Sequence, residues 1–355
     1  MRKSFVPILL LAGIATVCRG AASTYRAPEF PKDIRWLDKG DPVPHTIAGY
    51  RGKVVLIDFW DYTCINCIRD FAVLKSWYGK YRPYGFEIIG VHFGEFPMGS
   101  NVNNVEDAAK RFRLPWPVVV DNHGSLWKAY RSEVWPNRYL IGPNGDVVLQ
   151  VEGEGNNRVM EEKIRELLAP AHAEVAKIAL DPSEEASGPD CGVCTQETYV
   201  GDWYGRGALE NSQGYQDGAA VNFRADHEPG DGGVMLNGMW LTMHDGVTST
   251  APDATAALRY HARSAYAVMS ESQGVVRVYL QQDGKPLTSA DAGVDVRFDR
   301  SGSYVEVKEP RMYYLVKNPA FGAHLLTLQP QSSGFTLLSF TYGNNCQQNF
   351  DQRQP

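Results

Sequence analysis

The sequence predicts an α/β domain with a mixed sheet, followed by an all-β sandwich of the jelly-roll kind. In the first half, apolar segments with strand and helix periodicity follow one another in the order β-α-β-α-β-β-α. In the second half, about eight short alternating segments are separated by Gly, Asp and Pro turns. The length of 355 residues also exceeds that of one typical domain.

Composition narrows the function classes. Charged residues make up 21% and hydrophobic residues 43% of the chain, which is typical of a globular protein and not of a disordered one. The formal net charge is −6, and the sequence has no block of basic residues. Nucleic acid is therefore not an expected partner.

Residues 1–22 are expected to form a secretory signal peptide. Arg2 and Lys3 form a positively charged N-terminal region, residues 5–17 form a short apolar run, and the small residues 20–22 offer a cleavage site. The run is shorter than the roughly 20 apolar residues that a membrane span needs. We therefore expect an exported protein, in the periplasm or another extracytoplasmic compartment.

Export determines how the cysteines are interpreted, because disulfides persist outside the cytoplasm. Lipid attachment at Cys18 is not expected, since the bulky Val17 stands where a small residue is usual. Five cysteines remain after cleavage, and an odd number argues against a fully disulfide-stapled scaffold. Four of the five form two C-x-x-C pairs, and Cys346 is expected to be a lone thiol.

The first C-x-x-C pair lies between a predicted strand and a predicted helix. Residues 53–60, KVVLIDFW, have the β-branched and aromatic composition of a buried strand. Residues 68–81, IRDFAVLKSWYGKY, have apolar side chains at helical spacing. Cys64 and Cys67 would then occupy the turn into the helix.

The remaining elements of this domain alternate in the same way. In the last helix, Val159, Ile164 and Leu168 are predicted to face the sheet, with Leu167 beside them. The elements are a strand over 85–93, a helix over 104–113, a strand over 117–121, a hairpin over 138–151 with its turn at 143–145, and an amphipathic helix over 157–170.

Composition also predicts the domain boundaries. The α/β domain is expected over 23–172. An acidic stretch rich in Ala, Ser, Gly and Pro suggests a linker over 173–195, which carries the second C-x-x-C pair. The β-sandwich is expected over 196–350.

Three interpretations of Cys64 and Cys67 were weighed: a redox dithiol, half of a metal site and a structural bridge. Cysteines three apart on a first helical turn can meet disulfide geometry, and the helix N-terminus stabilises negative charge on the first sulfur. A bridge closing so small a loop would constrain the unfolded chain little. The redox interpretation is favoured, with Cys64 as nucleophile and Cys67 as the thiol that resolves the mixed disulfide.

Further site residues are predicted around this pair. Asp58 lies within an apolar strand, where an acid without a partner suggests proton transfer, although a solvent-facing edge position is the alternative. Pro136 precedes a strand, and a cis peptide there would expose the backbone of Trp135 to a substrate chain. Trp60, at the end of the first strand, is assigned to substrate binding with Trp135 and Pro136.

These features resemble the thioredoxin superfamily, and in particular its TlpA-like and DipZ-type exported members. The resemblance rests on RGKVVLIDFWDYTCINC at 51–67 and VWPNRYLIGPNGDVV at 134–148. It implies a thioredoxin fold with Cys64 and Cys67 as the catalytic pair, Asp58 as the buried acid and Pro136 as the cis proline.

The second half resembles the carbohydrate-binding-module-like domain that ends DipZ-type proteins, through EPRMYYLVKN at 309–318 and FTLLSFTYG at 335–343. Two departures matter. The membrane-embedded electron-transfer part of those proteins is not found here, so a separate membrane protein is the expected electron donor. Ile65 and Asn66 replace the Gly-Pro of thioredoxin itself, which leaves the direction of electron flow open, with reduction favoured over oxidation.

Cys191 and Cys194 form the second pair. A structural disulfide, a relay that exchanges electrons with the first pair, and a four-thiolate metal site were weighed. The 123 residues between Cys67 and Cys191 far exceed the usual spacing of a compact zinc site. The relay is slightly favoured over the structural bridge.

The expected function is exported thiol-disulfide exchange with protein cysteines, without a metal or a cofactor other than the dithiol. Two alternatives are a glycan- or protein-binding module with an accessory redox domain, and a thiolate carrier of Cu(I) or zinc. His92 and Glu95 are predicted to be capping or surface residues. Four aromatic residues of the β-domain are predicted to be core residues and not a sugar platform: Trp203, Tyr204, Trp240 and Tyr260.

Overall fold

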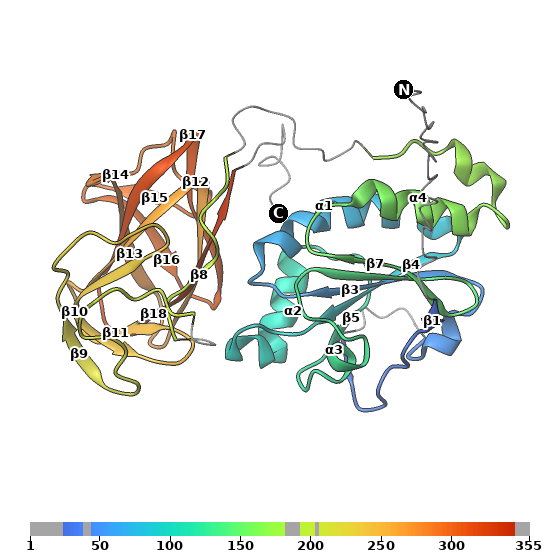
Figure 1. Ribbon diagram of the computed structural model, residues 1–355, viewed down its shortest axis with the longest axis horizontal. Helices are drawn as coiled ribbons and strands as arrows, with labels where there is room; N and C mark the ends of the chain where they lie inside the picture. The colour runs from blue at the N-terminus through green and yellow to red at the C-terminus, as the bar shows by residue number, and fades with distance from the viewer. Residues whose placement is uncertain (1–23, 38–43, 182–191, 203–205, 345–355) are drawn as a thin grey trace, which may run out of the picture.

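The computed structural model describes residues 24–37, 44–181, 192–202 and 206–344. The predicted signal peptide, Cys191, Cys346, Trp203 and Tyr204 lie outside the described residues. Figure 1 shows an α/β domain beside a domain built of strands.

The α/β domain has a seven-stranded sheet in the order β1-β7-β6-β3-β4-β5-β2. The three central strands β3, β4 and β5 are parallel, and the flanking pairs are antiparallel. This mixed arrangement confirms the predicted fold class. The strands are β1 Tyr25–Arg26, β2 Arg35–Leu37, β3 Val54–Trp60, β4 Phe86–His92, β5 Val118–Val120, β6 Asn137–Ile141 and β7 Asp146–Glu152.

Helices cover both faces of this sheet. Alternate residues of β3 point to opposite faces: Val54, Leu56 and Trp60 pack with α1, α2 and α4, whereas residues 55, 57 and 59 pack with α3 and the N-terminal segment. The helices are α1 Ile65–Tyr81, α2 Val102–Arg111, α3 Ser125–Ala129 and α4 Asn157–Leu168, with short 3-10 helices η1 Ile47–Tyr50, η2 Arg82–Tyr84, η3 Pro97–Ser100 and η4 Ala173–Lys177.

The buried face of α4 differs from the predicted one at its start. Val159 is 53% exposed, while Met160 and Ile164 are fully buried. Residues 157, 160, 161, 164 and 168 face inward, a set with the three- and four-residue spacing of one helix face. The prediction for Val159 is wrong because Met160, one position later, belongs to this set.

The start of the predicted linker packs on the α/β domain. Val175 of η4 is fully buried. The Asp181 carboxylate lies 2.8 Å from Lys80 Nζ of α1, and its backbone N–H donates to Glu161 of α4 at 2.7 Å. The chain is therefore fixed to the first domain as far as Asp181.

The β-domain is one antiparallel system of eleven strands within the described residues. β12 and β17 pair over most of their lengths, with register shifts around residues 262–266, and β12 continues onto β18. Such shifts bend long strands from one layer to the next. The strands are β8 Thr198–Tyr199, β9 Ala220–Phe223, β10 Val234–Thr242, β11 Val247–Ser249, β12 Thr255–Glu271, β13 Val276–Gln282, β14 Lys285–Pro286, β15 Arg297–Asp299, β16 Gly302–Val307, β17 Arg311–Pro330 and β18 Phe335–Gly343.

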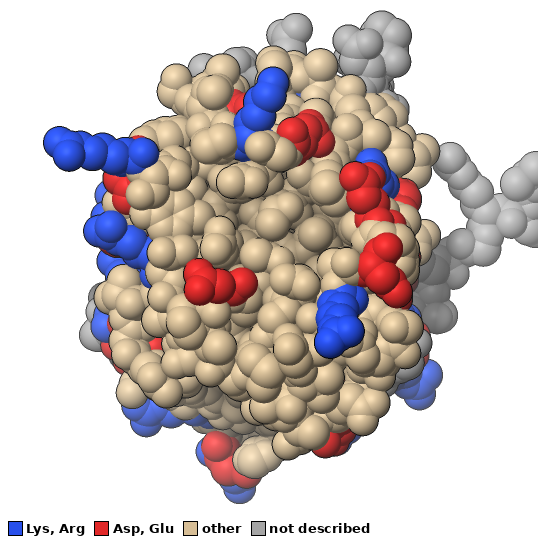
Figure 2. Space-filling model, turned by 90° about the vertical axis from the view of Figure 1, so that its left-hand side faces the viewer, with Lys and Arg blue, Asp and Glu red and all other residues tan. Residues whose placement is uncertain are grey.

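This domain encloses its own apolar core, as a β-sandwich requires. Trp240 and Tyr260 are fully buried in it, which confirms their assignment as core aromatics. Figure 2 shows the end of the β-domain that points away from the first domain. Positive and negative side chains are interspersed on that face, so its electrostatic field does not favour a highly charged partner.

The two domains share an apolar cluster. Side chains of the β-domain, among them Tyr266, Val268 and Met312, belong to the same buried cluster as α1 and the helix-covered face of the first sheet. Arg111 and Glu309 add an ion pair of 3.6 Å between the domains. Among the described residues, no helix is long and apolar enough to cross a membrane.

Candidate redox site

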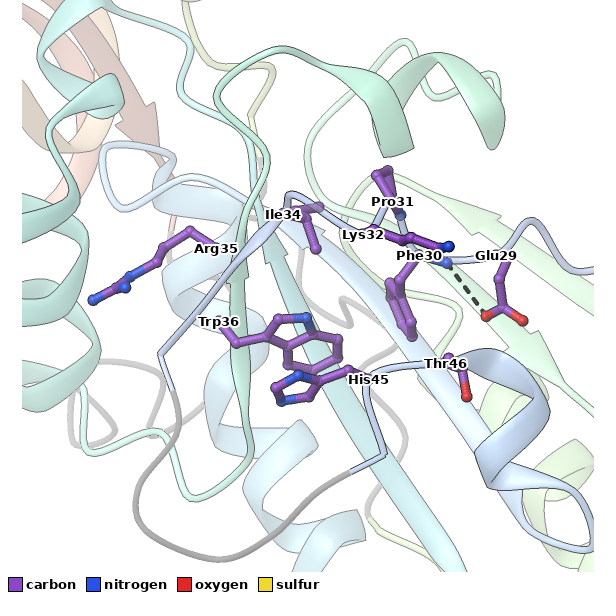
Figure 3. A pocket seen from close by; sticks show the side chains of 9 residues that line it. All are labelled: Glu29, Phe30, Pro31, Lys32, Ile34, Arg35, Trp36, His45 and Thr46. Carbon is purple, nitrogen blue, oxygen red and sulfur yellow. Dashed lines mark hydrogen bonds between the residues drawn. The ribbon is translucent and has the colours of Figure 1, made fainter.

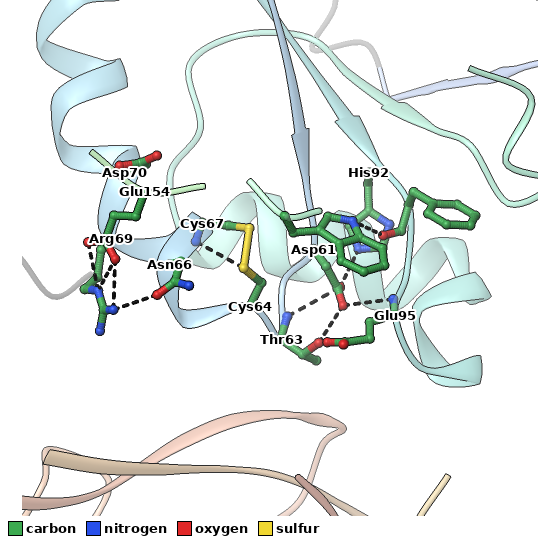
Figure 4. The surroundings of a disulfide bond; sticks show 12 residues. Asp61, Thr63, Cys64, Asn66, Cys67, Arg69, Asp70, His92, Glu95 and Glu154 are labelled. Atoms are coloured by element: carbon green, nitrogen blue, oxygen red, sulfur yellow. Dashed lines mark hydrogen bonds and ion pairs between the residues drawn. A yellow bond between two sulfur atoms is a disulfide. The ribbon is translucent and has the colours of Figure 1, made fainter. Parts of the chain in front are cut away.

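The first C-x-x-C pair lies where β3 leads into α1, as predicted. Cys64 and Cys67 form a disulfide, with their Cα atoms 5.4 Å apart. Cys64 is the N-cap of α1, and its sulfur accepts a hydrogen bond from the Cys67 N–H at 3.2 Å (Figure 4). Cys67 is buried, whereas Cys64 is partly exposed. The first sulfur is therefore the one that a partner molecule can reach.

The Trp135–Pro136 peptide bond is cis, which confirms that prediction. The Trp135 indole N–H donates to the Phe93 carbonyl at 3.0 Å, and the Phe93 N–H donates to the Trp60 carbonyl at 3.2 Å. These bonds place the proline loop beside the ends of β3 and β4, next to the dithiol turn. Trp135 also packs on Trp127, with ring centroids 4.4 Å apart.

Trp60 lies elsewhere than predicted. It has no exposed surface and packs edge-on against Phe71 of α1, at 5.3 Å between ring centroids. Because residues 54, 56 and 60 of β3 share the helix-covered face, the Trp60 ring points into the core. The predicted direct contact of Trp60 with substrate is therefore wrong, and its ring packs in the core between β3 and α1.

Asp58 is buried on the same face of β3, toward α1. Neither of its carboxyl oxygens has a hydrogen-bond partner among the described residues. Burial raises the pKa of Asp58 to about 7, and the charge of Arg138 opposes this. The solvent-facing alternative is thereby excluded, and an acid that changes protonation near neutral pH lies under the dithiol helix.

Arg138 was not identified from the sequence. It is the cross-strand neighbour of Asp58 on β6, and its guanidinium lies 3.4 Å from the Asp70 carboxylate of α1. Its side chain is fully buried and donates to Asn157 at 2.5 Å. The positive charge of this buried guanidinium partly offsets the negative charge of Asp58 and Asp70 beneath α1.

Asp61, just before the dithiol in the sequence, forms a buried pair with His92 at the end of β4. His92 Nε2 lies 3.0 Å from an Asp61 carboxyl oxygen, and both side chains are inaccessible. Asp61 also accepts from the Thr63 hydroxyl at 2.5 Å and from the Glu95 N–H at 3.1 Å. These bonds lower the pKa of Asp61 despite its burial. The prediction that His92 caps or lies on the surface is wrong, because β4 carries its ring into the core beside Tyr62.

Two protein families match this chain, one in each domain. Residues 25–150 match the AhpC/TSA family, and residues 195–343 match a thioredoxin like C-terminal domain. Protein DipZ of Mycobacterium bovis is 32% identical over 325 residues, which cover 89% of this chain and 43% of DipZ. The chain belongs to the thioredoxin superfamily. It is of the TlpA/DipZ type, as the sequence predicted.

Two further relatives match shorter stretches of the chain. Thiol-disulfide oxidoreductase ResA of Geobacillus kaustophilus is 34% identical over 109 residues, 31% of this chain and 60% of ResA. Human NHL repeat-containing protein 2 is 35% identical over 132 residues, 36% of this chain and 18% of that protein. The chain spans less than half the length of the DipZ relatives that it matches.

Arg69 lies on α1, two residues past Cys67, and its side chain is largely buried. It pairs with Glu154 at 2.9 Å and donates to Asn66 at 2.6 Å (Figure 4). Its charge also acts on the thiol of Cys194, whose pKa is raised by burial and lowered in part by Arg69. Cys194 is half-buried, and its thiol lies within range of the charge of Arg69, two residues past Cys67.

A separate cavity of about 550 Å³ lies on the N-terminal segment of the thioredoxin domain. Trp36 and His45 stack across it at 4.4 Å, and Glu29 accepts from the Phe30 N–H at 3.3 Å (Figure 3). None of its lining residues belongs to the redox site. The described residues hold no group of three or more His, Cys, Asp or Glu side chains that could bind a metal.

Proposed function

We propose that this protein is a thiol-disulfide oxidoreductase that exchanges electrons with cysteines of other proteins. The Cys64–Cys67 disulfide at the start of α1 carries this proposal, with the cis Pro136 loop beside it. A relative named thiol-disulfide oxidoreductase is 34% identical to this chain over 109 residues. We also propose export, on the sequence of residues 1–22, and reduction of substrate as the direction of exchange.

The reaction consists of two displacements at sulfur. The Cys64 thiolate attacks a substrate disulfide, forms a mixed disulfide and releases one substrate thiol, which takes up a proton. Cys67 then loses its proton, attacks the Cys64 sulfur and releases the second substrate thiol. Two electrons pass to the substrate, and Cys64–Cys67 is left oxidised. A membrane electron-transfer protein with its own dithiol is the donor that we propose for its reduction.

The first residues of α1 favour this chemistry. The Cys67 backbone N–H donates to the Cys64 sulfur, and the partial positive charge of the helix N-terminus stabilises the Cys64 thiolate. Asp58, buried on the sheet face that α1 covers, is the group that we propose to accept the proton of Cys67. Its pKa of about 7 suits a base that is regenerated near neutral pH.

Reduction of insulin by dithiothreitol tests this function. We expect the wild-type protein to accelerate precipitation of the insulin B chain, and a Cys64→Ser/Cys67→Ser variant to be no faster than dithiothreitol alone. A Cys346→Ser variant is the matched control for loss of a thiol. Equal rates for the wild type and the double variant would contradict the function.

We further propose that Cys191 and Cys194 exchange electrons with the first pair. The proximity of Cys194 to the charge of Arg69 supports this. Under limiting dithiothreitol, thiol mapping by mass spectrometry should find Cys191 and Cys194 reduced in the wild type but oxidised in Cys64→Ser. Equal reduction in both, with unchanged activity of Cys191→Ser/Cys194→Ser, would identify a structural bridge.

A further inference from the structure

A continuous path of hydrogen bonds joins the β-domain to the dithiol turn. The Tyr199 hydroxyl, on β8, bonds to the Glu95 carboxyl group of the thioredoxin domain. The Glu95 N–H donates to Asp61 at 3.1 Å, and the Asp61 carbonyl accepts from the Cys64 N–H at 3.2 Å. Tyr199 therefore lies three hydrogen-bonded steps from the residue that carries the nucleophile.

Glu197 joins the same contact from the β-domain side. One of its carboxyl oxygens lies 3.2 Å from the Tyr199 hydroxyl, which also contacts Glu95. A phenol has one proton and can donate to only one carboxylate. Both contacts are hydrogen bonds only if one of the two carboxyl groups is protonated and donates to the Tyr199 oxygen. We call Glu95, Tyr199 and Glu197 the clasp.

The charges around the clasp favour retention of that proton. Desolvation, the charge of Glu197 and that of Asp61 raise the pKa of Glu95 to about 8, and only Arg206 opposes them among the neighbouring charges. Glu197 is solvent-exposed, so Glu95, which is only partly exposed, is the carboxyl group of the clasp that retains the proton. The remaining ionisable neighbour, His92, is paired with Asp61.

The clasp closes an interface that includes the dithiol. Cys64 packs against the apolar cluster that the domains share, and Tyr199 and Leu338 enter this cluster from the β-domain. Figure 4 shows strands of the β-domain facing the end of α1 that carries the disulfide. A substrate chain that reaches Cys64 must therefore lie between this end of α1 and the β-domain.

We propose that Tyr199 is a positioning residue, which through the clasp holds the β-domain as the second wall of the substrate site. This rests on the proposed exchange at Cys64. The β-domain contacts a protein substrate on either side of its reacting disulfide, whereas a small disulfide needs to contact only the Cys64 sulfur. The clasp therefore governs the binding of protein substrates and not the chemistry of the dithiol.

Replacement of one hydroxyl group tests this. In Tyr199→Phe, we expect KM for insulin to rise about five- to tenfold, the worth of one hydrogen bond to a carboxyl group, with kcat nearly unchanged. Turnover of hydroxyethyl disulfide should stay within about twofold of wild type. Equal losses for both substrates would indicate general damage and overturn the proposal.

Tyr279→Phe is the matched control, because it removes a β-domain hydroxyl that donates to the Asp299 carboxylate at 2.7 Å outside the shared interface. It should behave as wild type with both substrates. If Tyr279→Phe raises KM for insulin as much as Tyr199→Phe does, the effect is not specific to the clasp and the proposal fails.

A second variant separates the shared proton from the packing of the ring. In Glu95→Gln, the amide can donate to the Tyr199 oxygen while the Tyr199 hydroxyl donates to Glu197, so the clasp needs no carboxylic acid proton. Between pH 7 and pH 9, KM for insulin should rise in wild type and stay flat in Glu95→Gln. The same pH dependence in both proteins would contradict the clasp.

Alkylation of Cys64 provides a readout that does not depend on turnover. Iodoacetamide should label Cys64 of the reduced Tyr199→Phe protein about threefold faster than wild type, because an opened interface exposes the sulfur. If wild type does not reduce insulin but labelling still differs, the proposed function fails and the clasp stands. If wild type reduces insulin but labelling is identical in the two proteins, the clasp fails alone.

Discussion

A Cys67→Ser variant will accumulate covalent complexes with its protein substrates, and a Cys64→Ser variant will not. Cys64 is the partly exposed sulfur at the helix N-terminus, so it forms the mixed disulfide. Cys67 is buried and can reach only the Cys64 sulfur, to which it is now bonded. Without Cys67 the mixed disulfide loses the thiol that resolves it in the first pair, and the covalent complexes should accumulate many-fold over wild type.

The complexes can be measured on non-reducing gels after incubation of each reduced variant with an oxidised protein substrate. The bands should disappear when dithiothreitol is added before electrophoresis. Cys194→Ser/Cys67→Ser should trap at least as much as Cys67→Ser alone, since Cys194 is not the nucleophile. Equal trapping by Cys64→Ser and Cys67→Ser, or faster alkylation of Cys67 than of Cys64, would contradict these roles.

Asp58→Asn should stabilise the oxidised protein at pH 8 much more than at pH 4. The folded-state pKa of Asp58 is about 7, above the ordinary value of 3.8, because its carboxyl group is buried without a hydrogen-bond partner among the described residues. Between these values the unfolded chain ionises while the folded chain stays protonated, so stability falls as pH rises. The loss is complete above about pH 7 and reaches at most about 4 kcal/mol.

Urea unfolding of both proteins at the two pH values measures this effect. Any pH-independent effect of the buried amide cancels when the change in free energy of unfolding at pH 4 is subtracted from that at pH 8. Asp61→Asn is a control of opposite sign, since the lowered pKa of Asp61 means that its charge stabilises the fold at neutral pH. A change for Asp58→Asn that is the same at pH 4 and pH 8 would show that Asp58 titrates normally.

Asp58 was predictable as a buried acid because the strand KVVLIDFW is apolar on both faces, and a carboxyl group there has nowhere to be solvated. Cys64 and Cys67 were also predictable, because their features depend on a few neighbouring residues, and the cis Pro136 was predictable through the family resemblance. The same holds for the order of strands and helices. Trp60 was misplaced because a residue at a strand end can face either the core or the substrate.

The partners of these residues were not predictable, since they come from distant parts of the chain. Arg138 faces Asp58 only through the β3–β6 register. His92 pairs with Asp61 because β4 runs parallel to β3. Tyr199 meets Glu95 across 104 residues and two domains. One signal was available in the sequence. His92 ends a buried strand and Glu95 lies just after it, and this strand lies beside the strand that leads to the dithiol.

The attachment of residues 173–181 to the first domain has a consequence for the interface. Asp181 is held by Lys80 and Glu161, and Gly192 is held in the β-domain by the Asn344 side chain at 3.1 Å. Ten residues, 182–191, connect these two fixed points, and they can span at most about 35 Å. So short a tether keeps the β-domain at an effective concentration in the millimolar range when the interface opens. Even a weak contact then closes again rapidly, so the β-domain returns to the dithiol turn soon after a protein substrate has entered or left.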